Sequence, residues 1–186
     1  SDLIRIRRVA GQRFELGPGG DQTAEVRVTE GQEVKAGQPL VVLAGKALAE
    51  SGAPAEAIAH YEAALRLEPT WAHAHYNLGN ALAELGRSGL AAEQFRHALR
   101  LKPDYLRARY NLGNMLVQLG DRSAALDEYL AVVRLRPDYA EARDNLGSVL
   151  LDLGRTAEAV EQYRQVVALG AAAPETHCNL GVALLL

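Results

Sequence analysis

The sequence predicts a mainly α-helical fold, an α-solenoid of about four and a half stacked helical hairpins behind a small N-terminal β segment. Two periodic features predict the solenoid. A glycine and a proline that interrupt helices return every 34 residues, and so does the string Asn-Leu-Gly, which begins at Asn77, Asn111, Asn145 and Asn179. A third observation, the short alternating runs of residues 1–43, predicts the β segment.

Each repeat is expected to contain two helices. The first should end near Leu85, Leu119 and Leu153, because the glycine that follows adopts the left-handed conformation without a Cβ penalty. The second has apolar residues three and four apart, as in Ala91–Leu101. It stops before a proline, which lacks the N–H donor. The turn glycines are Gly52, Gly86, Gly120 and Gly154, and the prolines are Pro69, Pro103 and Pro137.

The glycine of each Asn-Leu-Gly string lies inside a first helix, where it costs about 1 kcal/mol relative to alanine. This cost is explained if the two helices of a hairpin cross closely at the glycine. We expect small residues of the second helix to face it, namely Ala57, Ala91, Ala125 and Ala159. An aromatic series keeps the same interval, at Tyr61, Phe95, Tyr129 and Tyr163.

These columns resemble the tetratricopeptide repeat family over about three quarters of the chain. The resemblance implies a solenoid domain at 44–186, with a degenerate first repeat, three whole repeats and a partial fifth. Their bounds are 44–71, 72–105, 106–139, 140–173 and 174–186. Two features depart from the family. Its aromatic residue early in the first helix is His75, Arg109 or Arg143 here, and Gly170 stands where a proline is expected after the fourth repeat.

One asparagine per repeat precedes Leu-Gly, and Asn80 and Asn114 lie one helical turn further along the first helix. Asparagine is a mediocre helix former, but its side chain carries both an acceptor and two donors. A row of asparagines therefore predicts binding of an extended peptide through its main chain. Similar ladders line the superhelical repeats of O-linked N-acetylglucosamine transferases. The alternative is a structural role, with each amide bonded inside its own repeat or to water.

The candidate peptide-binding residues lie on the first helices, which line the concave side of such solenoids. They are His73, Tyr76, Asn77, Asn80, Arg107, Tyr110, Asn111, Asn114, Asn145 and Asn179. Clustered lysines are missing, so the carboxylate clamp of the family's chaperone adaptors is not expected. Later repeats become acidic, at Glu141, Asp144, Asp152 and Glu175. A ligand that is neutral or acidic at one end and basic at the other would fit.

Residues 1–43 are predicted to form a separate β-rich segment. Its strand-like runs are Leu3–Val9, Arg13–Leu16, Ala24–Thr29 and Leu40–Leu43, although the last run also fits a helix. The stretch Val26–Leu43, with turns around Gly31 and Gly37, resembles half of a biotinyl/lipoyl-type module. Envelope adaptor proteins split this module around a helical insertion. Lys46 is not expected to be acylated, because helical sequence follows it. The strands would cap the first repeat or pair with strands from outside this chain.

No motif in the sequence indicates catalysis, a cofactor or a metal. The five histidines lack metal-ligand spacing, and no phosphate-binding glycine motif is present. Cys178 is interpreted as a small residue of the groove or core. A net charge of -3 and a pI near 6.0 argue against nucleic-acid binding. No stretch approaches the roughly 18 apolar residues of a membrane span.

The sequence thus predicts a non-enzymatic scaffold that binds an extended segment of a protein or peptide partner. Two alternatives are the substrate-recognition region of a glycosyltransferase whose catalytic domain follows, and an envelope adaptor or assembly factor. The run Leu184–Leu186 would leave an apolar edge. We therefore expect self-association there, cover by a partner, or a natural protein that continues. A bacterial source is expected, and the cytoplasm is favoured over the periplasm without being established.

Overall fold

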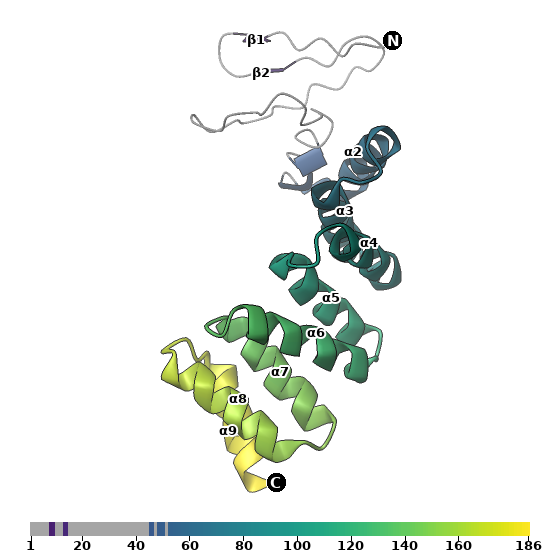
Figure 1. The fold of residues 1–186 in the computed structure, drawn as a ribbon. Coiled ribbons are helices and arrows are strands. Elements are labelled where there is room, and N and C mark those ends of the chain that lie inside the picture. Colours follow the sequence, from purple (N-terminus) through teal and green to yellow (C-terminus); the bar gives the residue numbers. More distant parts are fainter. Residues whose placement is uncertain (1–7, 10–12, 15–44, 47, 51) are drawn as a thin grey trace. The chain divides into compact units, whose positions relative to one another are not determined.

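The computed structural model describes residues 8–9, 13–14, 45–46, 48–50 and 52–186 (Figure 1). The chain divides into two compact units, Ser1–Gly86 and Arg87–Leu186. In both units helices follow one another through short turns. The predicted fold class, a mainly α chain of repeated helical hairpins, is confirmed.

The N-terminal part of the first unit contains two short strands, β1 (Arg8–Val9) and β2 (Arg13–Phe14). They pair antiparallel, with Arg8 opposite Phe14. Both strands fall inside the first two predicted β runs. The other two runs, the stretch that resembles a biotinyl/lipoyl module and the predicted boundary at residue 43 lie outside the described residues.

The first unit continues with helical residues 45–46 and 48–50, followed by α2 (Pro54–Leu67) and α3 (Ala72–Glu84). Lys46 forms an exposed ion pair with Glu50, at 3.6 Å. Helix α2 begins with proline, whose missing N–H costs nothing at the first helical position. It packs against α3, which carries the first complete Asn-Leu-Gly string.

The second unit consists of six helices among the residues that the structure describes. They are α4 (Ser88–Leu101), α5 (Leu106–Gln118), α6 (Arg122–Leu135), α7 (Ala140–Asp152), α8 (Thr156–Ala168) and α9 (Pro174–Leu185). Each helix packs against the next one along the chain, and α7 also contacts α9 (Figure 1). First helices α5, α7 and α9 therefore alternate with second helices α4, α6 and α8.

The predicted helix ends are confirmed. Helices α3, α5 and α7 end one residue before Leu85, Leu119 and Leu153. The glycine that follows each leucine has a positive φ, as at Gly120 with 82°. Helices α2, α4 and α6 end two residues before their proline. After α8, Gly170 takes the left-handed conformation with φ 68° and ends the helix in place of proline.

The buried glycines Gly113 and Gly147 of the first helices lie against tyrosine rings of the second helices, a contact that the sequence analysis did not predict. A Cβ added at Gly113 would lie 2.7 Å from Cε1 of Tyr129, and one at Gly147 would lie 2.7 Å from Cε1 and Cζ of Tyr163. The aromatic column therefore covers the glycine, and the alanines fill the core beside it. A flat ring needs the whole space left by the missing methyl group, whereas an alanine would leave a void there.

The arginines that replace the family's aromatic residue tie each repeat to the turn before it. Arg109 donates to the carbonyl oxygen of Pro103 at 2.9 Å and to Glu128 on α6 at 2.7 Å. Arg143 donates to Pro137 at 2.7 Å and to Gln162 on α8 at 2.8 Å. In the first unit, His75 Nε2 lies 3.0 Å from the carbonyl oxygen of Pro69. A polar contact thus replaces apolar packing at this position.

Replacing Arg143 by alanine should lower the free energy of unfolding by about 1–2 kcal/mol, because two hydrogen bonds from a charged group are lost. Chemical denaturation followed by circular dichroism measures this change. Arg164→Ala on α8 is the matched control, since Arg164 is exposed and pairs with none of the described residues. We expect the control to stay within about 0.5 kcal/mol of wild type. Equal losses in both variants would contradict the structural role of Arg143.

Candidate functional site

Four polar side chains meet where α5, α6 and α7 come together, and we call this group the polar rung: Tyr110, Asn114, Tyr129 and Asn145. Asn145 Nδ2 donates to the Tyr110 hydroxyl and to Asn114 Oδ1, both at 3.1 Å. The Tyr129 hydroxyl also donates to Asn114 Oδ1, at 2.6 Å. Asn114 Oδ1 thus accepts two hydrogen bonds, and both N–H groups of Asn145 are used within the protein.

The rung leaves three groups without partners among the described residues. They are Asn145 Oδ1, the proton of the Tyr110 hydroxyl, and the amide N–H groups of Asn114. The buried side-chain atoms that lack a partner in the described part of the chain are Arg109 Nε and Asp144 Oδ1. Asn145 Oδ1 and Asn114 Nδ2 are not among them, so both atoms reach solvent. This face therefore offers one acceptor beside several donors.

Aromatic rings hold the rung in place. The Tyr110 ring centroid lies 5.2 Å from that of Tyr139, which precedes α7, and 6.1 Å from that of Tyr129. Both pairs are tilted, at separations typical of favourable ring contacts. Burial, with a further contribution from Tyr110, raises the pKa of Tyr129 well above its usual range. A tyrosine is protonated at neutral pH in any case, and the raised pKa extends the donation from Tyr129 to Asn114 into alkaline solution.

The next repeat has different chemistry at the equivalent positions. Ser148 takes the place of Asn114, and its hydroxyl oxygen lies 3.1 Å from the Tyr163 hydroxyl. The Ser148 O–H donates to the main-chain carbonyl oxygen of Asp144 at 3.2 Å. Asp144 takes the place of Tyr110, and its Oδ1 atom is buried without a hydrogen-bond partner. A carboxylate thus replaces a hydroxyl at the same position one repeat later, as the acidic trend of the sequence predicts.

The structure places the other candidate residues on first helices as well. Asn111 is half-buried on α5, where Arg107 is exposed, and Asn179 is half-buried on α9. The side chains of Arg107 and Asn179 form no hydrogen bond with any described residue. In the first unit α3 carries four candidates, of which the first is exposed and the others half-buried: His73, Tyr76, Asn77 and Asn80. Among the candidates in the second unit, hydrogen bonds join Tyr110, Asn114 and Asn145.

One predicted ligand-tuning residue already has a partner. Asp152, near the end of α7, accepts a hydrogen bond at 2.9 Å from Arg122, near the start of α6. One repeat earlier, Ser88 on α4 donates to Gln118 on α5 at 2.6 Å. The two contacts occupy equivalent positions, and they join α4 to α5 and α6 to α7. The charge of Asp152 is thus compensated within the protein, which leaves Glu141, Asp144 and Glu175 as the acidic groups of these helices.

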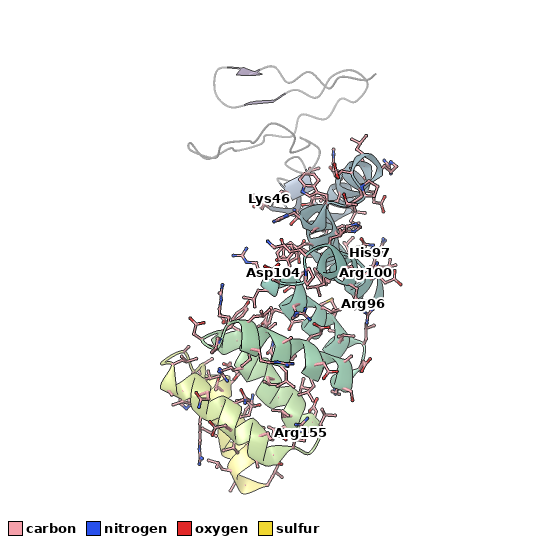
Figure 2. The ribbon with its side chains drawn as sticks, viewed as in Figure 1. Lys46, Arg96, His97, Arg100, Asp104 and Arg155 are labelled. Carbon is pink, nitrogen blue, oxygen red and sulfur yellow. The ribbon has the colours of Figure 1, made fainter. Side chains whose placement is uncertain are left out.

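Several other charged residues of the second unit are exposed. Arg96, His97 and Arg100 are exposed on α4, and Arg100 lies 2.7 Å from His97 Nδ1 (Figure 2). Arg155 holds Glu158 through two bonds of 2.7 and 2.8 Å. Among the described residues, no group of three or more histidine, cysteine, aspartate or glutamate side chains is arranged for a metal ion. None of their helices is long and apolar enough to cross a membrane.

Sequence reasoning missed Tyr129 as part of the site. It identified the aromatic column as packing residues but not the hydroxyl that reaches Asn114. The signal was present in the sequence: the second and third whole repeats pair a polar residue at 114 or 148 with a tyrosine 15 residues later. The first whole repeat has Phe95 in this column, which has no hydroxyl.

Comparison with known families agrees with the repeat pattern. Residues 45–86 match a family described as "TPR repeat", and residues 84–140 and 110–175 match one described as "Tetratricopeptide repeat". Together these matches cover residues 45–175. No curated protein shows significant similarity to this sequence.

Solved structures with a similar fold include YrrB, described as a TPR protein with an unusual peptide-binding site. It is 28% identical with a TM-score of 0.72, over 77% of this chain and 74% of its own. MamA from Desulfovibrio magneticus RS-1 is 27% identical with a TM-score of 0.75, over 78% and 82%. Another MamA crystal structure is 25% identical with a TM-score of 0.68, over 70% and 76%.

Proposed function

The chain belongs to the tetratricopeptide repeat family, and we propose that it is a non-enzymatic scaffold that binds an extended segment of a protein partner. The binding face that we propose consists of the first helices α5, α7 and α9 in the second unit. Stacked repeats of this kind create extended concave surfaces. The likeness to YrrB, itself described as having a peptide-binding site, supports the proposal.

The observation that carries the proposal is the set of unused polar groups on neighbouring first helices. On α5 these are the Tyr110 proton and the Asn114 amide, on α7 the Asn145 oxygen, and on α9 the Asn179 amide. They lie on half-buried side chains of well-packed helices, so their positions are set before a ligand arrives. An extended peptide exposes main-chain donors and acceptors that match such groups, whatever its own side chains are.

Binding through these groups should be moderate. A net hydrogen bond contributes about 1 kcal/mol, so four to six bonds supply roughly 4–6 of the roughly 8 kcal/mol of micromolar binding. Apolar contacts with rings such as Tyr110 would supply the rest. The exposed acidic groups Glu141 and Glu175 favour a basic ligand residue over α7 and α9. Arg107 on α5 favours a neutral or acidic one at the other end.

The test begins with a random library of short peptides selected on the whole chain. Peptides that are enriched over an unrelated helical protein are then measured by calorimetry. We expect micromolar affinity and at least about a tenfold loss when Asn111, Asn145 and Asn179 are all replaced by alanine. The control replaces Glu93 and Arg96, two exposed residues of α4, by alanine and should bind like wild type. Enrichment of no peptide, or equal affinity in all three proteins, would contradict the proposal.

The hydrogen bonds of the second unit do not bear on the other functions that the sequence suggests. Catalysis by a domain beyond this sequence and an adaptor role built on residues 1–43 stay predictions. Self-association is favoured by one observation, the exposure of Leu184, Leu185 and Leu186 at 57%, 89% and 83%. Apolar patches of this kind often mark contact sites between proteins.

A further inference from the structure

We propose that Tyr110 and Asn145 act together as a reader of one ligand residue, with the Tyr110 hydroxyl donating to its C=O and Asn145 Oδ1 accepting from its N–H. This inference rests on the proposed function and specifies what one part of the binding face recognises. It predicts that the residue bound here carries a free main-chain N–H, so proline is excluded at that position of the ligand.

In the structure, hydrogen bonds within the protein orient Asn145. Its two N–H groups are bound by the Tyr110 oxygen and by Asn114 Oδ1, both at 3.1 Å. With Asn114 as it stands, turning the Asn145 amide over would place Asn145 Oδ1 against Asn114 Oδ1, and two acceptors repel each other. Asn114 is held in turn by the Tyr129 hydroxyl at 2.6 Å. Asn145 therefore presents its oxygen outward, which differs from a ladder asparagine that uses both halves of its amide.

The orientation of Tyr110 follows from the same bond. Its hydroxyl oxygen accepts a hydrogen bond from Asn145, so the O–H proton points away from Asn145. None of the described residues accepts this proton. The Tyr110 ring is held between Tyr139 and Tyr129, which restricts the directions that the O–H can take. A directed donor thus lies next to a directed acceptor.

Such a pair matches the edge of an extended chain. In a hydrogen-bonded pair of an antiparallel sheet, one residue exchanges both its N–H and its C=O with the opposite strand, so the two groups of that residue face the same side. A neighbouring donor and acceptor on the protein can therefore engage both groups of one residue. Side chains of the ligand do not enter this contact, which makes the pair tolerant of sequence except for proline, whose nitrogen carries no hydrogen.

The experiment uses a peptide selected on the wild-type chain and a set of its variants, each methylated at one main-chain nitrogen. One position should lose about tenfold in affinity on methylation, because both the hydrogen bond and its donor are removed. Tyr110→Phe should weaken the unmodified peptide about fivefold. Tyr163→Phe also removes a hydroxyl from a ring, but one that bonds to Ser148, and should bind like wild type.

The decisive measurement is a double-mutant cycle between the sensitive peptide position and Asn145→Ala. If Asn145 Oδ1 accepts that N–H, methylation should cost no further affinity in the alanine variant. Full loss on methylation in both proteins would overturn the inference while leaving peptide binding intact. Wild-type affinity in Tyr110→Phe would overturn it as well. Failure to select any peptide would instead contradict the proposed function, so the two failures are distinguishable.

Discussion

Gly147→Ala is expected to lower the free energy of unfolding by about 1–2 kcal/mol, although alanine is the better helix former by about 1 kcal/mol. The new methyl group would lie 2.7 Å from the Tyr163 ring, far inside contact distance. The ring is fully buried and its hydroxyl lies 3.1 Å from that of Ser148, so it has no free space to move into. Strain in the α7–α8 hairpin should therefore exceed the gain in helix propensity.

The matched control is Gly181→Ala on α9, which belongs to the same Asn-Leu-Gly column. No atom lies within 4 Å of a Cβ added at Gly181. Without a facing ring, this substitution should stabilise the chain by up to about 1 kcal/mol. Denaturant unfolding of both variants at equal ionic strength gives the comparison. If the free energy of unfolding changes in the same direction in both variants, packing against the Tyr163 ring is not the reason why residue 147 is glycine.

The sequence predicted the helical repeat well because the residues that end its helices act locally. Glycine after Leu119 and proline after Leu101 act on their own stretch of backbone, so their effects can be derived without knowing the neighbouring helices. The apolar run Ala91–Leu101 marks α4 but not its start, because the first turn of the helix, beginning at Ser88, shows little apolar periodicity. In the first helices, the choice of glycine over alanine could be seen but its cause could not. That cause is a tyrosine ring 16 residues away in sequence.

The candidate site was predicted in its residue types and faces but not in its bonding. The asparagine column indicates that polar groups lie along one face of the first helices, and Asn145 on α7 belongs to this column. Whether its donors point to a ligand or to the protein depends on Tyr110 and Asn114 in the preceding repeat. Such contacts differ between repeats because one residue changes, as where Asp144 replaces tyrosine. A repeat pattern records what the repeats share, so it does not predict hydrogen bonds that differ from one repeat to the next.

Tyr129→Ala should have the largest effect on stability, a loss of about 3–5 kcal/mol, as found for large aromatic residues removed from a core. The side chain is 1% exposed and fills the space above Gly113, so its removal leaves a cavity between α5 and α6. Tyr129→Phe keeps the ring and removes the hydrogen bond to Asn114, so it should cost about 1 kcal/mol. Thermal and denaturant unfolding of the two variants measure both losses.

The position of Tyr129 in the chain makes the loss spread beyond its own hairpin. In a repeat protein each hairpin is stabilised by its neighbours, so a weakened α5–α6 hairpin separates α4 from α7–α9. Hydrogen exchange should therefore speed up in α5, α6 and α7 of Tyr129→Ala, with α8 and α9 less affected. Uniform acceleration over all helices would indicate a single cooperative unit instead. In Tyr129→Phe, exchange should stay near wild type while peptide affinity falls, because Asn114 and with it Asn145 lose their anchor.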